Sequence, residues 1–181
     1  MSSFESAVRL IAQWLLIVPA LIMLWSIASR KKWRVDVLEA VVSGALTILL
    51  VKIAGASYFH ARPFVEFGMV PLVPHVADNG FPSDHLAACG LAIGYLWKRN
   101  LFAVAAVILC AGAIGAARVL AELHWPADIA AGLALGIVAA ILGRLIVGLA
   151  VRYTGSHRRA DAYESADAFT SGNDAVEPEA V

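Results

Sequence analysis

Charged side chains and cysteines are scarce in this chain. It holds 14 Lys and Arg against 14 Asp and Glu in 181 residues, so its formal net charge is zero. Without a basic excess there is no electrostatic footprint for nucleic acid, and we predict no nucleic-acid partner. The two cysteines, Cys89 and Cys110, both lie in apolar runs. Such cysteines are packed side chains more often than a disulfide or a metal-binding pair.

Apolar residues are abundant instead. They make up 60% of the chain, against about 45–50% in a soluble domain, and the mean hydropathy is +0.75. Five apolar runs occupy residues 10–28, 35–59, 86–97, 101–121 and 129–151. A membrane span needs about 20 mostly apolar residues, and only the third run is clearly shorter. The sequence therefore predicts an all-α, polytopic membrane helical bundle with about five transmembrane helices.

The ends of the chain differ in character. The segment before the first run carries Glu5 and Arg9 without a net positive charge, and a basic cluster follows the run. This order favours a retained helix over a signal peptide. From residue 154 the chain turns polar and increasingly acidic with no apolar period. We expect a transmembrane domain over residues 1–153 and a disordered cytosolic tail over 154–181.

Basic residues are concentrated in alternate loops. They occupy residues 30–34 and 98–100, and they recur after the fifth run at Arg152, Arg158 and Arg159. Loops rich in Lys and Arg stay in the cytosol, so the 60–84 segment and the 118–126 turn are expected on the other side. Arg144 is expected to reach the cytosolic surface by snorkelling.

Three polar clusters fall on that non-cytosolic side. They are HARPF at residues 60–64, FPSDH at 81–85, and a segment from Arg118 to HWPAD at 124–128. Pro126 suits the first position of a helix, so the fifth helix is expected to begin there. His124 and Asp128 are four residues apart, which predicts contact between the side chains, with the carboxylate fixing the imidazole tautomer.

The residue types in these clusters suit phosphate chemistry. Arg62 and Arg118 carry planar donor groups that match phosphate oxygens. Ser83 reads as a helix cap, where free backbone N–H groups attract an anion. His85 would lie in the first turn, placed to act as an acid. Each cluster alone is common by chance, but their coincidence at one membrane face favours function.

The clusters resemble the motifs of the phosphatidic acid phosphatase type 2 superfamily: Lys-x6-Arg-Pro, Pro-Ser-Gly-His and Ser-Arg-x5-His-x3-Asp. The sequence departs at three motif positions, where Gly55, Asp84 and Ala117 replace Lys, Gly and Ser. Lys52 lies one turn before Gly55. It either reaches the pocket or is a helix lysine that snorkels or is neutralised by Glu39.

Within that superfamily the chain is most similar to the bacitracin-resistance type of undecaprenyl-diphosphate phosphatase, which carries His-x-Arg-Pro-Phe-Val, Phe-Pro-Ser-Asp-His and His-Trp-Pro-x-Asp. The resemblance implies a phosphorylated His124 oriented by Asp128, with His85 protonating the leaving group. It also implies a phosphate held by Arg62, Ser83 and Arg118. We expect no metal or cofactor, because the cationic side chains supply the positive charge. Further candidates for the site are Lys52, His60 and Asp84.

The resulting hypothesis is a hydrolase of the bacterial inner membrane with its active site on the non-cytosolic side. It would convert undecaprenyl diphosphate to undecaprenyl phosphate and phosphate, supporting cell-wall synthesis and bacitracin resistance. The partners would be membrane lipid and a prenyl or other lipid phosphate. Three alternatives remain open. They are a phospholipid phosphatase or lipid phosphotransferase with the same site, a small helical transporter subunit, and a metal hydrolase using His75, Asp78 and His85.

Overall fold

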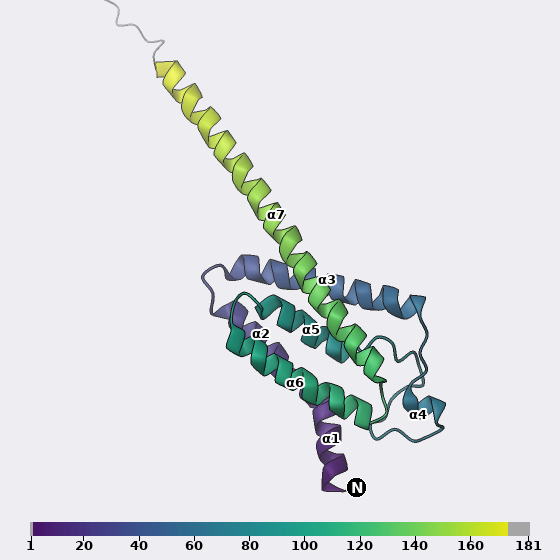
Figure 1. Cartoon of the computed structure of the whole chain (residues 1–181). Helices are drawn as coiled ribbons and strands as arrows, with labels where there is room; N and C mark the ends of the chain where they lie inside the picture. Colours follow the sequence, from purple (N-terminus) through teal and green to yellow (C-terminus); the bar gives the residue numbers. More distant parts are fainter. Residues whose placement is uncertain (1, 174–181) are drawn as a thin grey trace, which may run out of the picture. The chain divides into compact units, whose positions relative to one another are not determined.

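The computed structural model describes the backbone of residues 2–173 and the side chains of residues 2–154 and Ser156. This part of the chain is helical and forms no strand, which confirms the predicted all-α class (Figure 1). The helices are α1 Ser3–Trp14, α2 Ile17–Ala28, α3 Trp33–Ser57, α4 Pro63–Glu66, α5 Asp84–Leu96, α6 Leu101–Leu120 and α7 Pro126–Asn173.

Among the described residues, four segments are long and apolar enough to cross a membrane: Ser3–Ala28, Trp33–Ser57, Leu101–Leu120 and Pro126–Thr154. They match four of the five predicted spans. The remaining prediction corresponds to α5, which has 13 residues and extends about 20 Å at 1.5 Å per residue. Because a hydrocarbon core is about 30 Å thick, α5 is too short to cross it as a straight helix. Most of its residues are buried in the bundle.

The first span is broken where one continuous helix was expected. Helix α1 ends at Trp14 and α2 begins at Ile17. Pro19 explains the break, because proline lacks the N–H that would bond to Leu15 and its ring crowds that carbonyl. Helix α1 also begins earlier than its apolar run, since Ser2 and Glu5 form a reciprocal capping box.

The chain divides into two compact units, residues 1–144 and residues 145–181. Helix α7 continues past Thr154 to Asn173, so the first 20 residues of the predicted tail are helical rather than irregular. Residues 174–181 of that tail lie outside the described residues.

Glycines bring α5 and α7 into close contact. A Cβ atom on Gly132 would collide with the carbonyl of Ser83, and one on Gly136 with the carbonyl of Ala87. In the other direction, a Cβ on Gly90 would meet the carbonyl of Leu133. Each helix carries a Gly-x-x-x-Gly pair, the spacing that lets membrane helices approach closely. This contact places the first residues of α5 and α7 side by side.

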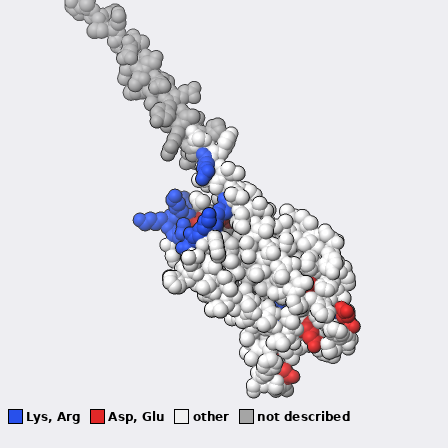
Figure 2. All heavy atoms as spheres, in the orientation of Figure 1, with Lys and Arg blue, Asp and Glu red and all other residues white. Residues whose placement is uncertain are grey.

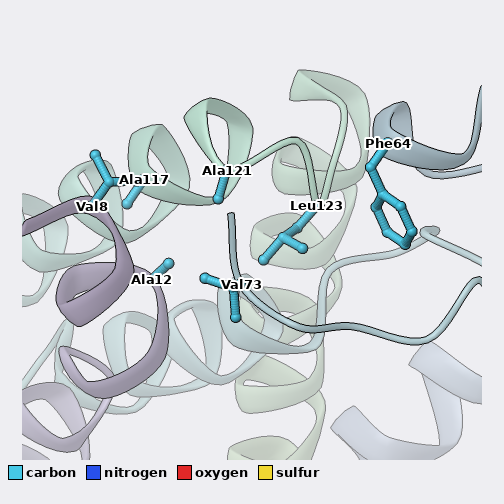
Figure 3. Packing of buried hydrophobic residues seen from close by; sticks show 7 residues of the cluster. All are labelled: Val8, Ala12, Phe64, Val73, Ala117, Ala121 and Leu123. Atoms are coloured by element: carbon cyan, nitrogen blue, oxygen red, sulfur yellow. The ribbon is translucent and has the colours of Figure 1, made fainter. Parts of the chain in front are cut away.

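A small apolar cluster supports the loop that follows α6. Val8 and Ala12 of α1 pack with Ala117 and Ala121, and the cluster is completed by Phe64, Val73 and Leu123 (Figure 3). Leu123 is fully buried. Its neighbour His124 is therefore held by packing on one side and by the start of α7 on the other.

Buried charged side chains lie near the N-terminal end of α3. Glu39 accepts hydrogen bonds from Arg99 at 2.7 and 3.0 Å and from Arg144 at 3.2 Å, and Arg99 also donates to Asp36 at 3.1 Å. Arg144 additionally donates to the carbonyls of Gly94 and Tyr95. This network corrects one expectation, the pairing of Glu39 with Lys52. Glu39 pairs with Arg99 and Arg144 instead, and the Arg144 side chain remains partly exposed.

The exposed charges separate along the unit. Figure 2 shows Lys and Arg gathered where α2 joins α3, with the exposed acidic side chains at the opposite end. The basic group comprises Arg30, Lys31, Lys32 and Arg34, and the acidic group includes Glu66, Asp78 and Asp84. The acidic end also carries the three motif clusters.

Candidate active site

The three motif clusters surround one cavity of about 440 Å³. Its walls come from the last turns of α3, the residue before α4, the segment between α4 and α5, the start of α5, the end of α6 and the turn before α7. The lining residues are Val51, Lys52, Gly55, Ala56, Arg62, His75, Asp78, Asn79, Phe81, Pro82, Asp84, His85, Arg118 and His124.

His124 is buried, with 3% of its surface exposed. It lies in the short turn between α6 and α7. Its Nδ1 is 2.8 Å from the carbonyl oxygen of Gly80. Because a carbonyl only accepts, Nδ1 carries the proton and the neutral ring has its lone pair on Nε2. That Nε2 faces Nη2 of Arg118 at 3.2 Å and Nη1 of Arg62 at 3.4 Å, so an unprotonated nitrogen points between two guanidinium groups.

This environment keeps His124 neutral. Burial, followed by the positive charges of Arg118 and Arg62, lowers the pKa of His124 to about 3. A neutral imidazole with a free lone pair is the nucleophilic form of histidine. The same two guanidinium groups can hold the oxygens of a phosphate that approaches Nε2.

Asp128 does not hold His124 in the expected way. Its Oδ2 is 3.7 Å from His124 Nδ1, which is too long for a hydrogen bond. Instead Oδ2 accepts from the backbone N–H of Trp125 at 2.9 Å, and Oδ1 lies 2.7 Å from Nδ1 of His60. The reason is that α7 begins at Pro126, as predicted, so His124 precedes the helix and the i, i+4 rule does not apply to it.

Arg62 is fixed by several acceptors. Its Nη1 donates to the carbonyl of Leu123 at 2.8 Å, Nη2 donates to the carbonyl of Asn79 at 3.3 Å, and Nε donates to Asp78 at 2.8 Å. Although burial raises the pKa of Asp78, the hydrogen bond and the charge of Arg62 bring the pKa below its ordinary value. The guanidinium is therefore held in place before any phosphate arrives.

Arg118 and Ser83 retain bonding capacity. Arg118 is 4% exposed and donates from Nη1 to the carbonyl of Ala12 at 3.1 Å. Ser83 is the N-cap of α5, as expected, and is completely buried. Within the described part of the chain, Nε of Arg118 and Oγ of Ser83 have no hydrogen-bond partner. Unpaired buried donors are costly, and a bound oxyanion would satisfy such groups.

The remaining candidates divide between the cavity and its surroundings. His85, Asp84 and Lys52 line the cavity, so the position of Lys52 fits the first of its two interpretations. Gly55 stands where the superfamily pattern has lysine, and a Cβ atom there would lie only 3.1 Å from the carbonyl of Phe81. His60 is not among the lining residues and reaches the site through Asp128.

Two residues of the site were not predicted. Gly80 supplies the carbonyl that orients His124. The side chain of Asn79 accepts from the N–H groups of His60 and Phe81 and donates to the carbonyls of Gly55 and Tyr58. It thereby ties the end of α3 to the loop before α5. The Asn-Gly pair at 79–80 marks a turn in the sequence, but a turn motif does not reveal which carbonyl faces a histidine.

The metal-hydrolase alternative requires ligands that converge. Among the described residues, no group of three or more His, Cys, Asp or Glu is arranged to hold a metal ion. His75 and Asp78 do line the cavity, but Asp78 is engaged by Arg62. The geometry favours arginine-held phosphate over this alternative.

Comparisons with known proteins agree with the geometry. The chain is 30% identical over 145 residues to undecaprenyl-diphosphatase BcrC of Bacillus subtilis (strain 168), covering 78% of this chain and 74% of that protein. It is 29% identical over 152 residues to bacitracin transport permease protein BcrC of Bacillus licheniformis, covering 77% and 70%. The crystal structure of Aquifex aeolicus LpxE matches with a TM-score of 0.60 at 25% identity, covering 77% of this chain and 82% of that one. Residues 36–152 match the PAP2 superfamily. This chain belongs to that superfamily and is an integral membrane phosphatase that acts on lipid phosphates.

Proposed function

We propose that the protein is a lipid-diphosphate phosphatase that converts undecaprenyl diphosphate to undecaprenyl phosphate through a phosphohistidine at His124. The observation that carries the proposal is the unprotonated Nε2 of His124, which lies between Arg118 and Arg62 and faces an open cavity. A buried neutral imidazole flanked by two fixed cations suits attack on a phosphorus whose oxygens those cations hold.

In the first step Nε2 of His124 attacks the terminal phosphorus. A P–N bond forms and the bond from phosphorus to the bridging oxygen breaks. Arg62, Arg118 and the hydroxyl of Ser83 bind the non-bridging oxygens, whose charge grows towards the transition state. His85 lines the same cavity at the start of α5. Burial, Arg118 and His75 lower the pKa of His85 to about 4, and the negative charge of a bound diphosphate favours its protonated form. In that form His85 gives a proton to the departing lipid monophosphate.

In the second step water attacks the phosphorus of the phosphohistidine. His85 accepts the proton of that water, the P–N bond breaks, and inorganic phosphate leaves. His124 returns to its neutral form and His85 to its protonated form, so each turnover consumes one water. The cationic side chains supply the charge stabilisation, and no step calls for a metal ion.

The prenyl class is supported by the similarity to undecaprenyl-diphosphatase BcrC of Bacillus subtilis, and a second cavity supports a substrate with a lipid chain. This cavity, of about 300 Å³, shares His75, His85 and Arg118 with the first and is also lined by Gln13 and Trp14. Trp14 is 61% exposed and belongs to the span Ser3–Ala28. A lipid chain leaving the phosphate site on the side of His85 would enter this cavity and continue along the span.

The site is proposed to face away from the cytosol. The basic loop at residues 30–34 precedes α3, and the site lies at the opposite end of that helix. With 25 residues, α3 is about 37 Å long. A cysteine placed at Ala77 should react with an impermeant thiol reagent in intact cells, and one at Lys98 should not. The reverse labelling would place the chemistry in the cytosol.

Phosphate release by the purified protein in detergent tests the substrate class. A long prenyl diphosphate should have a higher kcat/KM than phosphatidic acid or phosphatidylglycerol phosphate, and His124→Ala should hydrolyse none of them. Faster turnover of the glycerolipid phosphates would make the protein a phospholipid phosphatase. Appearance of a phosphorylated lipid acceptor instead of free phosphate would make it a phosphotransferase.

A further inference from the structure

His60 is hydrogen-bonded to Asp128, the carboxylate that lies behind the proposed nucleophile. Its Nδ1 lies 2.7 Å from Oδ1 of Asp128. The ring stacks against Trp125, with centroids 5.8 Å apart, and is tilted against Tyr58 at 5.7 Å. The His60 backbone N–H donates to Asn79, and its carbonyl accepts from Gly80. The ring is therefore held by two aromatic neighbours and by both polar groups of its own backbone.

Asp128 depends on this histidine. The carboxylate is fully buried, and its hydrogen bonds in the described structure come from His60 Nδ1 and the backbone N–H of Trp125. A buried carboxylate needs hydrogen-bond donors that compensate for its lost hydration. Because an ionised carboxylate is purely an acceptor, Nδ1 of His60 carries the proton of this bond.

The charge on His124 changes during the proposed reaction. The ring is neutral before attack and gains positive charge as Nε2 bonds to phosphorus, while Nδ1 keeps its proton on Gly80. Two guanidinium groups already stand beside Nε2, so this new charge is unfavourable unless a negative charge lies behind the ring. The carboxylate of Asp128, at 3.7 Å from Nδ1, is placed to supply it.

We infer that His60 is a positioning residue for the reaction: its Nδ1–H donates to Asp128 and holds the carboxylate in place, so that the carboxylate stabilises the phosphohistidine cation. The inference rests on the proposed function, because it requires His124 to be the nucleophile. His60 acts through Asp128, since it does not line the cavity that would hold the phosphate. Its loss should therefore slow catalysis without weakening substrate binding.

Three substitutions separate the hydrogen bond from the packing. His60→Asn keeps an N–H donor near the position of Nδ1, His60→Gln places its donor nearer the position of Nε2, and His60→Phe keeps an aromatic ring against Trp125 and Tyr58. Asn and Gln both lose the aromatic stack, so a difference between them reports on the position of the donor. We expect His60→Asn to keep kcat within about 3-fold of the wild type. His60→Gln and His60→Phe should lose roughly 10- to 100-fold in kcat, the scale of a hydrogen bond to a charged group, with KM nearly unchanged.

A double-mutant cycle with Asp128→Ala completes the test. If His60 acts through Asp128, His60→Phe should cause no further loss of kcat in the Asp128→Ala protein. The comparison uses p-nitrophenyl phosphate beside a prenyl diphosphate, so it remains readable if the proposed lipid class is wrong. A His60→Asn protein no more active than His60→Gln would overturn the inference. So would a full additional loss in the double mutant, or a loss confined to KM.

Discussion

The tautomer and charge of His124 can be observed directly. The bond to the Gly80 carbonyl puts the proton on Nδ1, and the two guanidinium groups leave Nε2 unprotonated. Burial, Arg118 and Arg62 lower the pKa of this imidazole from 6.5 to about 3. That shift corresponds to roughly 5 kcal/mol against protonation at about 1.4 kcal/mol per pKa unit. The free enzyme should therefore keep His124 neutral down to about pH 4.

Replacing Arg118 with Gln tests the cause. The substitution removes the larger of the two arginine effects on His124 while leaving the burial and the Gly80 bond in place. The pKa of His124 should rise towards the ordinary value but stay below it, because burial and Arg62 still oppose protonation. Phosphate bound between the two arginines should also raise the pKa of His124.

Nitrogen-15 NMR of histidine-labelled protein in detergent micelles measures both properties. The chain has five histidines, and the signal missing from His124→Ala identifies the one of interest. In the wild type it should show a protonated Nδ1 and a bare Nε2 from about pH 8 to 4. The protonated form should appear at higher pH in Arg118→Gln. A His124 signal that titrates near pH 6.5 in the wild type, or that shows the proton on Nε2, would refute the reasoning.

Four further results are expected. Lys52→Ala should raise KM several-fold for a lipid diphosphate and much less for a lipid monophosphate in the same phosphate-release assay, because Lys52 is a cation that lines the cavity and the diphosphate brings a second anionic group to it. An equal change for both substrates would remove Lys52 from the site. Activity should persist in excess chelator and be inhibited by vanadate, whereas loss with chelator and recovery with a divalent ion would contradict the arginine-based mechanism. His85→Gln should lose about 10²–10⁴-fold in the rate at which a lipid substrate phosphorylates the enzyme. With p-nitrophenyl phosphate the loss, measured as the burst of p-nitrophenol, should be far smaller, since that leaving group departs without a proton. Equal losses with the two substrates would exclude the acid role. Glu39→Gln should lower the unfolding temperature in detergent by about 5–10 °C, because the buried guanidinium of Arg99 loses its charged partner. The substitution Glu66→Gln at an exposed site should change the unfolding temperature little, and equal effects would show that the buried network contributes nothing.

The helices and the grouping of the motif residues could be predicted from the sequence. Apolar run length locates a membrane helix, and loop charge assigns alternate ends to one side. Arg62, His85, Arg118 and His124 converge as expected because each lies at or beside the end of a helix on that side. The Gly-x-x-x-Gly pairs of α5 and α7 were also visible in the sequence and would have predicted their close approach.

The finer contacts depend on loop paths, which residue spacing does not encode. His124 and Asp128 have helical spacing, but the helix begins between them, so the carboxylate turns to Trp125 and His60 instead. The carbonyl of Gly80 belongs to a loop 44 residues away from His124, and every residue has a carbonyl, so no side chain marks it. Likewise the pairing of Glu39 with Arg99 and Arg144 joins separate helices at the far end of the bundle.

The covalent intermediate tests the central claim most directly. The wild-type protein and His85→Gln are mixed with a prenyl diphosphate carrying ³²P at the terminal phosphate, then quenched in alkali and digested. The label should be found on the peptide containing His124, be lost in acid, and persist longer in His85→Gln, where the water step is slowed. His124→Ala should carry none. Label on another residue, or turnover by His124→Ala, would contradict the account.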